Sequence, residues 1–578
     1  MAIKRLCYPV VVLVCVLVMA GNLYGVVASP RICELVQPDG SIINARQWGD
    51  EWLHGWETTE GYTIVKDKSG FWVYADRDST GQLYPANVRA DGPAPEKQKR
   101  FLRPGGERAR KAVRQRREAT VKVVPSTGTA KIPILLINYG DTTSTNTPAE
   151  FESLLFDLSP AIATGPGSMK DYYEEVSYGA FSVSSGPSGV SGWHTAVNGH
   201  DYYGQNFLGF DEFPAELVKE AVLAADAAGF DFSQYDNDGD GKVEVVNIVH
   251  QGSGEEESNV ATDIWSHSWS LTNAGVGSVS VDGVIVDDYV IQPERWSSGG
   301  MITIGVFAHE FGHALGLPDL YDTDYSSMGI GDWGLMASGS YNQTTNSGDS
   351  PAHLSAWCKY FLGWVTPTSV SSTLTDEVIE QADTTAEVYQ LLSGSKTSGE
   401  YFLVENRQKS GFDQGLPGDG LLIWHIDGTL ISNNLNSNSV NDNECYPGGP
   451  SCAANHYGVV LEQADNLWQL EKFLSQGDEG DPYPGSENNT SFTDSSSPDS
   501  DLHDGDQGVA SVTDISSSGS QMTATLAVND TVTTTTTPAE STTTTAESTT
   551  TTVLVTTTTT TIAPEDLPDL EACAPYGW

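Results

Sequence analysis

The sequence has few basic residues and no long apolar run after its N-terminal segment. Lys and Arg total 29 against 77 Asp and Glu, which gives a formal net charge of −48. A surface of this sign repels nucleic-acid phosphates, so the nucleic-acid-binding classes are excluded. A spanning helix needs ~20 apolar residues, and we therefore expect no membrane span.

Cysteine is scarce as well. The chain has 578 residues and 7 cysteines, of which Cys7 and Cys15 lie in the N-terminal apolar segment. The 5 that remain are an odd number, so complete pairing is excluded. In an oxidising compartment we expect a disulfide between Cys445 and Cys452, and a buried thiol at Cys358. The length predicts two or more domains.

The N-terminal segment is typical of a secretion signal. Lys4 and Arg5 precede an apolar stretch from Cys7 to Ala20, and Val26-Val27-Ala28 is a small-residue cleavage site. The alternative, a membrane anchor, is disfavoured because the apolar stretch is short. We therefore expect residues 1–28 to be removed and the mature protein to be extracellular.

The residues from His309 to Asp319 read H-E-x-x-H-x-x-G-x-x-D. On a helix, His309 and His313 lie on one face and can bind one metal ion. Glu310 can take a proton from a water on that metal, and Gly316 allows a sharp turn that returns Asp319 as third ligand. Three protein ligands leave one position for water, as in catalytic zinc sites. The alternative is a chance match on an amphipathic helix.

Two neighbouring features favour the metal-site interpretation. Residues 302–308 are apolar and predict a helix buried along one side. The segment Trp333–Tyr341 is typical of a Met-turn, which would place Met336 under the metal ligands. The alternative for Met336 is ordinary core packing.

These motifs resemble the immune inhibitor A-like family of secreted zinc metalloproteases. The runs that carry the resemblance are HEFGHALGLPDLYD, GIGDWGLMASGSYN, SPAHLSAWCKYFLGW, SMKDYYEEVSYGAFSV, FDFSQYDNDGDGKVEVVNIVHQG and EYFLVENRQKSGFDQGLPGDGLLIWHID. The resemblance covers most of the chain from the pro-region to about Val528. The resemblance implies an acidic third ligand at Asp319, where metzincins more often have His.

The predicted fold class is α+β. We expect a metzincin-like zinc protease catalytic domain at 124–366, preceded by a pro-region at 29–118 and followed by an antiparallel β-sandwich-like domain at 367–528. Residues 529–578 form a Thr-rich linker and tail that cannot bury a core.

A basic run ends the pro-region. It contains 10 of the 29 basic residues of the chain, between Lys97 and Arg117. Such a run is usually a solvated linker and is compatible with a cleavage site, as a zymogen requires. Cys33 could bind the zinc in the latent form, or it could be a structural cysteine.

The segment from Asp236 to Glu244 resembles a calcium loop. Alternate carboxylates can converge on one hard cation, and glycines permit the tight turn. The match is partial because Asn247 occupies the twelfth position, where an EF-hand has Glu. An acidic turn is the alternative. The expected calcium ligands are Asp236, Asp238, Asp240 and Glu244.

We therefore predict a secreted zinc endopeptidase that is made as a zymogen and cleaves extracellular proteins, with Glu310 as the catalytic base. We expect protein or peptide substrates, zinc and calcium as cofactors, and a monomer. One alternative is a catalytically inactive zinc fold used for adhesion or binding. Another is a zinc hydrolase that acts on a non-peptide amide.

Overall fold

The computed structural model describes residues 24–105, 124–205, 211–258, 260–395, 397–505 and 510–528. The Thr-rich tail, most of the secretion signal and the second half of the basic run lie outside these ranges. The chain divides into the units Met1–Asp530 and Thr531–Trp578, and all described residues belong to the first. Within the described ranges, no helix has the length and hydropathy needed to cross a membrane.

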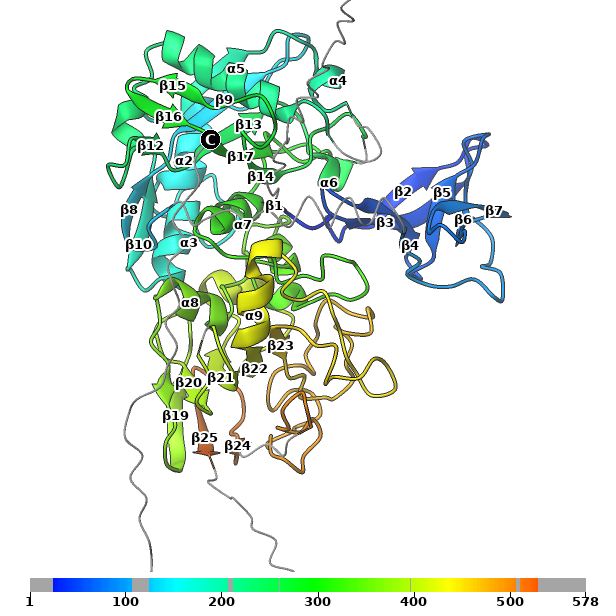
Figure 1. Cartoon of the computed structure of the whole chain (residues 1–578), viewed down its shortest axis with the longest axis vertical. Helices are drawn as coiled ribbons and strands as arrows, with labels where there is room; N and C mark the ends of the chain where they lie inside the picture. The colour runs from blue at the N-terminus through cyan, green and yellow to red at the C-terminus, as the bar shows by residue number, and fades with distance from the viewer. Residues whose placement is uncertain are drawn as a thin grey trace, which may run out of the picture. The chain divides into compact units, whose positions relative to one another are not determined.

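A six-stranded sheet lies beside the helix that carries the predicted metal motif (Figure 1). Its strands, in spatial order, are β1 (Tyr24–Gly25), β14 (His267–Ser270), β17 (Asp288–Pro293), β13 (Val246–His250), β9 (Ile134–Asn138) and β11 (Ser191–Thr195). Strands β11, β9, β13 and β17 are parallel, whereas β14 is antiparallel to β17. The two-residue strand β1 pairs antiparallel with the outer edge of β14.

The apolar run in β9 is continuous because helices cover both faces of the sheet. Ile134 and Leu136 pack into the core that contains α7 (Ile304–Ala314). Leu135 and Ile137 pack into a second core with α5 (Pro214–Ala227). Figure 1 shows α5 and α7 on opposite sides of the sheet. The predicted mixture of helix and sheet is confirmed.

Local capping residues set the helix boundaries. Helices α2 (Pro148–Phe156) and α3 (Met169–Val176) each begin with a capping box. Helix α8 spans Ala356–Leu362. The Ser355 side chain accepts a hydrogen bond from the Cys358 N–H, which fixes the start of α8, and Gly363 at φ 80° ends it.

Two sheets form the region after α8. The five-stranded sheet consists of β18 (Thr368–Ser369), β20 (Tyr389–Leu391), β21 (Glu400–Arg407), β22 (Gly420–Asp427) and β23 (Val459–Leu461). The three-stranded sheet consists of β19 (Leu374–Glu380), β25 (Gln521–Val528) and β24 (Ala510–Thr513). Phe402 and Ile423 share a core with the smaller sheet, whereas Leu403 and Trp424 face the core that contains α7.

The predicted pro-region contains an antiparallel sheet with its own small core. Its strands are β2 (Cys33–Val36), β3 (Ile42–Gly49), β4 (His54–Thr58), β5 (Thr63–Lys66), β6 (Trp72–Arg77) and β7 (Leu83–Arg89). Arg103 departs from the expected solvated linker, because it is 7% exposed and pairs with Glu57 at 3.0 Å. Its Nε also donates to the Tyr325 carbonyl at 3.1 Å.

Short elements complete the described chain. They are β8 (Gly128–Lys131), β10 (Phe181–Ser184), α4 (His200–Tyr203), β12 (Lys242–Val243), α6 (Glu255–Ser258), β15 (Val279–Val281), β16 (Val284–Val286) and α9 (Gly428–Asn434).

Candidate metal centre and active site

The predicted metal ligands meet beside α7. His309 and His313 lie one helical turn apart, and Gly316 at φ 93° turns the chain after the helix so that Asp319 returns to them. The two Nε2 atoms are 3.2 Å apart, and Asp319 Oδ1 lies 3.2 Å from His309 Nε2 and 3.4 Å from His313 Nε2. The three side chains are 0%, 4% and 1% exposed, so the structure brings them together in the interior.

The hydrogen bonds of the two imidazoles show which nitrogen faces the centre. His309 Nδ1 lies 2.8 Å from the Leu335 carbonyl and His313 Nδ1 lies 2.9 Å from the Leu317 carbonyl. A carbonyl only accepts, so each Nδ1 carries the proton and each Nε2 presents a lone pair. Two such nitrogens and the Asp319 carboxylate are three acceptors that converge, an arrangement that a cation stabilises. Two imidazoles and one carboxylate fit zinc.

Asn438 holds the third ligand in place, although it follows Asp319 by 119 residues. Its Nδ2 donates to Asp319 Oδ2 at 2.5 Å, and its Oδ1 accepts the Asp319 N–H at 2.7 Å. Burial alone would raise the pKa of Asp319, but the adjacent His313 and His309 lower it below its ordinary value. The sequence analysis missed Asn438, because no local motif connects a loop asparagine to a ligand so far away.

Glu310 lies next to the ligands with its carboxylate buried. Its Oε1 accepts the Val26 N–H at 2.8 Å, and its Oε2 has no hydrogen-bond partner among the described residues. Burial and the nearby Asp319 carboxylate raise its pKa well above the ordinary value. A carboxylate in this environment is suited to accept and return a proton.

Met336 lies against α7 at Gly312, the residue before His313. A Cβ at Gly312 would lie 2.6 Å from Met336 Sδ, so only glycine allows this approach. The Met336 carbonyl accepts the Leu320 N–H at 2.7 Å, which links the methionine loop to the ligand loop. Met336 is 1% exposed and supports the ligand-bearing turn of α7 from below.

An extended segment, residues 25–28, lies over the metal ligands. It continues from β1 along the edge strand β14, and its direction is antiparallel to that strand. Three of its carbonyls accept side-chain hydrogen bonds, from Tyr321 Oη to Gly25 at 2.9 Å, from Trp265 Nε1 to Val26 at 2.8 Å and from Tyr341 Oη to Val27 at 2.8 Å. Added strands of this kind are a common mode of peptide recognition.

The contact with Glu310 is thus made by Val26 and not by Cys33. Cys33 lies on β2, opposite Ala45, with its Sγ 3.9 Å from the Arg31 carbonyl. The structure therefore gives no support to Cys33 as a zinc-bound switch. The sequence also did not single out Tyr321 and Trp265 as residues that contact this segment.

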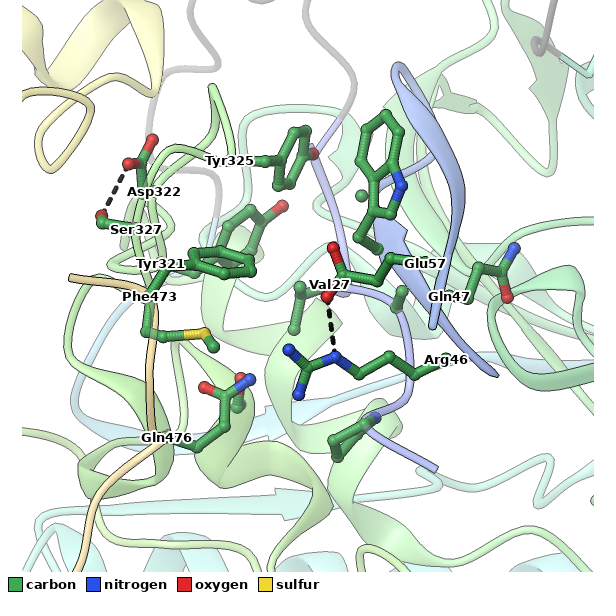
Figure 2. A pocket seen from close by; sticks show the side chains of 16 residues that line it. Val27, Arg46, Gln47, Glu57, Tyr321, Asp322, Tyr325, Ser327, Phe473 and Gln476 are labelled. Atoms are coloured by element: carbon green, nitrogen blue, oxygen red, sulfur yellow. Dashed lines mark hydrogen bonds and ion pairs between the residues drawn. The ribbon is translucent and has the colours of Figure 1, made fainter. Parts of the chain in front are cut away.

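A small cavity of about 50 Å³ lies where the pro-region meets the catalytic loops (Figure 2). Arg46 and Glu57 from the pro-region face Tyr321 and Tyr325 across it. Arg46 Nε donates to Glu57 Oε1 at 2.8 Å, and this carboxylate is completely buried. The pro-region thus packs directly against the residue that holds the Gly25 carbonyl.

The expected calcium loop is closed by its own hydrogen bonds. Ligand atoms of Asp236, Asp238 and Glu244 lie within 4.8 Å of one another, whereas Asp240 is outside this group and accepts the Lys242 N–H at 2.9 Å. Glu244 Oε1 already accepts the backbone N–H groups of residues 237 and 238 at 2.8 and 3.0 Å.

The cysteines of the described chain include one bonded pair. Cys445 and Cys452 form a disulfide. Cys358 is completely buried, and burial raises the pKa of its thiol to about 12. Cys33 and Cys358 form no disulfide within the described residues.

Residues 144–365 match the family model described as "Immune inhibitor A peptidase M6, catalytic domain". The resemblance predicted from the motifs is confirmed. The pre-pro-metalloprotease PrtV of Vibrio cholerae is 35% identical in an alignment of 249 residues. The alignment covers 37% of this chain and 26% of that protein. Immune inhibitor A of Bacillus thuringiensis subsp. alesti is 31% identical over 268 residues, 36% of each chain. The chain thus covers 26% and 36% of the length of these two relatives. The stretch that matches the family model, residues 144–365, contains α7 and the predicted metal ligands.

Proposed function

We propose that the chain is a secreted, zinc-dependent endopeptidase that is made as a zymogen. The convergence of His309, His313 and Asp319 beside Glu310 carries this proposal. The similarity of residues 144–365 to metalloprotease domains supports it. Substrates would be extended segments of extracellular proteins, bound along β14 in the place that residues 25–28 take in the structure.

The residues of the chain supply the steps around the scissile bond. Bound zinc would polarise the scissile carbonyl and lower the pKa of water toward ~7. Glu310 takes the proton of the attacking water and returns it to the leaving amine. The Val26 N–H, 2.8 Å from Glu310, occupies the place of such an amine. Tyr321 Oη, which donates to the Gly25 carbonyl at 2.9 Å, would orient the carbonyl of a bound substrate.

Latency would follow from the same contacts. Val26, which lies in the segment predicted to be removed as a secretion signal, contacts Glu310, and residues of the predicted pro-region lie beside Tyr321. While this part of the chain is in place, it would keep a protein substrate from the predicted metal ligands. The basic run that ends near Arg117 is the expected place for processing. We also propose that Asp236, Asp238, Asp240 and Glu244 hold a structural calcium ion. Calcium-dependent protection against thermal unfolding, absent in Asp238→Asn, would support that assignment.

Cleavage of casein by the protein after processing near Arg117 tests the proposed activity. We expect about one tightly bound zinc at the α7 site and cleavage that a chelator abolishes. Glu310→Gln should keep the zinc and lose the cleavage, whereas Glu479→Gln, at an exposed carboxylate outside the site, should retain both. An active Glu310→Gln protein would refute the role of the base. Zinc without cleavage in the trimmed wild type would favour the inactive adhesion or binding fold.

A further inference from the structure

A second group of histidines lies in the C-terminal region. The rings of His425, His503 and His456 are stacked, with centroids 4.0 Å apart for the first pair and 3.8 Å for the second. All three line a pocket of about 520 Å³, and the disulfide loop between Cys445 and Cys452 lines it as well. The proposed protease function uses none of these side chains.

Carboxylates surround the stack. His425 Nε2 lies 3.1 Å from Glu400 Oε2, and His425 Nδ1 lies 3.2 Å from Glu462 Oε1. Glu400 Oε2 also accepts the backbone N–H of His503 at 3.0 Å, which holds this carboxylate next to residue 503. The side chains of His425, Glu462 and Glu400 are 2%, 9% and 19% exposed, so water solvates them little.

The group offers a complete set of metal ligands. Ligand atoms of Glu400, His425 and His503 lie within 4.8 Å of one another. Nε2 of His503 is buried and has no hydrogen-bond partner in the described part of the chain. An imidazole nitrogen without a partner, beside a second imidazole and a carboxylate, is an arrangement that a transition-metal ion would satisfy.

The surroundings of His425 repeat the arrangement at the α7 centre. There, His309 directs one ring nitrogen to a backbone acceptor and the other toward Asp319. Here, His425 directs Nδ1 to Glu462 and Nε2 toward Glu400. A carboxylate on the far nitrogen is the usual second partner of a metal-bound histidine, because it fixes the tautomer and orients the ring.

We propose that Glu400, His425 and His503 bind a second divalent transition-metal ion, of the zinc class, beside this pocket, which His425 and His503 line. Glu462 is then a positioning residue that orients His425. The site is independent of the protease site, because none of its residues contacts His309, His313 or Asp319 in the described structure.

A proton is the competing occupant. His425 lies between two carboxylates and His456 between Asp427 and a backbone carbonyl, so each ring can carry a second proton instead of binding a metal. A ring nitrogen binds metal in the plane of its ring, and the parallel rings of His425 and His503 would therefore have to tilt on metal binding. Metal content separates the two cases.

The first measurement is the zinc content of the full chain after zinc loading with calcium present and gel filtration. We expect about two zinc ions in the wild type, and about one in either His309→Ala or His503→Ala. His194→Ala, which removes a histidine of β11 outside both groups, should keep two. Zinc retained by His309→Ala but lost after His503→Ala is added would establish the second site.

Equal zinc content in wild type and His503→Ala would overturn the proposal and favour the proton. If His503→Ala does not fold, Glu400→Gln replaces it, with the same expected loss of one zinc. Glu462→Gln should weaken zinc binding at this site by about 10- to 100-fold in a His309→Ala background, while leaving the stoichiometry at saturation unchanged. Failure of casein cleavage would leave these outcomes unaffected, because they report metal content alone.

Discussion

Each ligand of the α7 centre is oriented by an atom that does not face the centre. His309 and His313 are held by backbone carbonyls at their Nδ1 atoms, and Asp319 is held by Asn438 at its second oxygen. Such outer partners fix the direction of the ligand lone pairs and reduce the conformational entropy lost on metal binding. Asn438 is the one such partner that a side-chain substitution can remove.

We expect Asn438→Ala to weaken zinc binding by about 10- to 100-fold, because the freed Asp319 carboxylate can turn away from the histidines. Competition with a chromogenic chelator at fixed pH measures this change. Asn434→Ala is a matched control. Within the described structure, the Asn434 side chain donates one hydrogen bond, to the Leu430 carbonyl at 3.0 Å. Equal zinc affinity in the wild type and Asn438→Ala would contradict the positioning role.

Gly312 is the second residue whose substitution tests the centre. A methyl group there would meet Met336 Sδ at 2.6 Å, so we expect Gly312→Ala to destabilise the protein by about 1–3 kcal/mol. Urea unfolding measures the loss. In the Gly312→Ala background, Met336→Ala should cost less stability than it does in the wild type, because shortening Met336 relieves the clash. Strict additivity of the two changes would show that the contact is unimportant.

The ligand residues could be predicted from the sequence because they lie within 11 consecutive positions of one helix and its following turn. Asn438, Tyr321 and the segment that covers Glu310 could not. Their roles depend on contacts between distant parts of the chain, and no periodicity or spacing reports such contacts. The two alternatives for Cys33 stayed open for the same reason, because a thiol is chemically suitable for zinc while its place in β2 is not visible in the sequence.

At the scale of elements, β14 forms the edge along which the covering segment lies. His267 in this strand is buried; its Nδ1 donates to the Trp265 carbonyl at 2.7 Å, and its Nε2 lies 3.1 Å from Tyr289 Oη. Burial lowers the pKa of His267 to about 4. The strand is therefore built around a neutral histidine.

This histidine gives the strand a defined pH dependence. The unfolded chain binds a proton at His267 below about pH 6.5, whereas the folded protein binds it only near pH 4. The free energy of unfolding therefore decreases as the pH falls between these two values. We expect His267→Gln to reduce this loss by up to about 3 kcal/mol at the acidic end. Urea unfolding at pH 7 and pH 4.5 measures the difference. An unchanged pH slope would show that His267 is charged in the folded protein.

The central elements were predictable where burial is strong. The continuous apolar run of β9 and the apolar positions of α3 and α5 correspond to buried residues in the structure. The start of α8 depends on the capping bond of the Ser355 side chain, a local contact that apolar periodicity does not show. The acidic loop at Asp236 was predicted as a calcium loop, with an acidic turn as the alternative, and the sequence did not show its internal hydrogen bonds.

At the scale of the whole molecule, the five-stranded sheet belongs to two cores at once. One face packs against the smaller C-terminal sheet, and the other joins the core that contains α7. The sequence predicted a strand-rich region after residue 366 but not this shared core, because outward and inward faces of a strand cannot be assigned without its neighbours. The proposed catalytic region is therefore stabilised by strands that follow it in the chain.

N-terminal sequencing of the secreted precursor decides how the site is covered before activation. Cleavage after Ala28, as the sequence predicts, would remove the residues that contact Glu310, and latency would then depend on residues 29–105. A precursor that begins before Tyr24 would keep the Val26 contact. In that case we expect Val26→Pro, which removes the N–H donor to Glu310, to raise the activity of the unprocessed protein. Unchanged activity would show that the pro-region alone covers the site.

The bond between Asp319 and Asn438 also has a consequence in time. A ribosome that adds ~5–20 residues per second needs about 6–24 s to go from the first of these residues to the second, across 119 positions. During that interval the helix and its three ligands can already form, but the aspartate has no amide to hold it. The order of synthesis thus postpones the completed centre until most of the chain has left the ribosome, and a truncated translation product lacks it altogether.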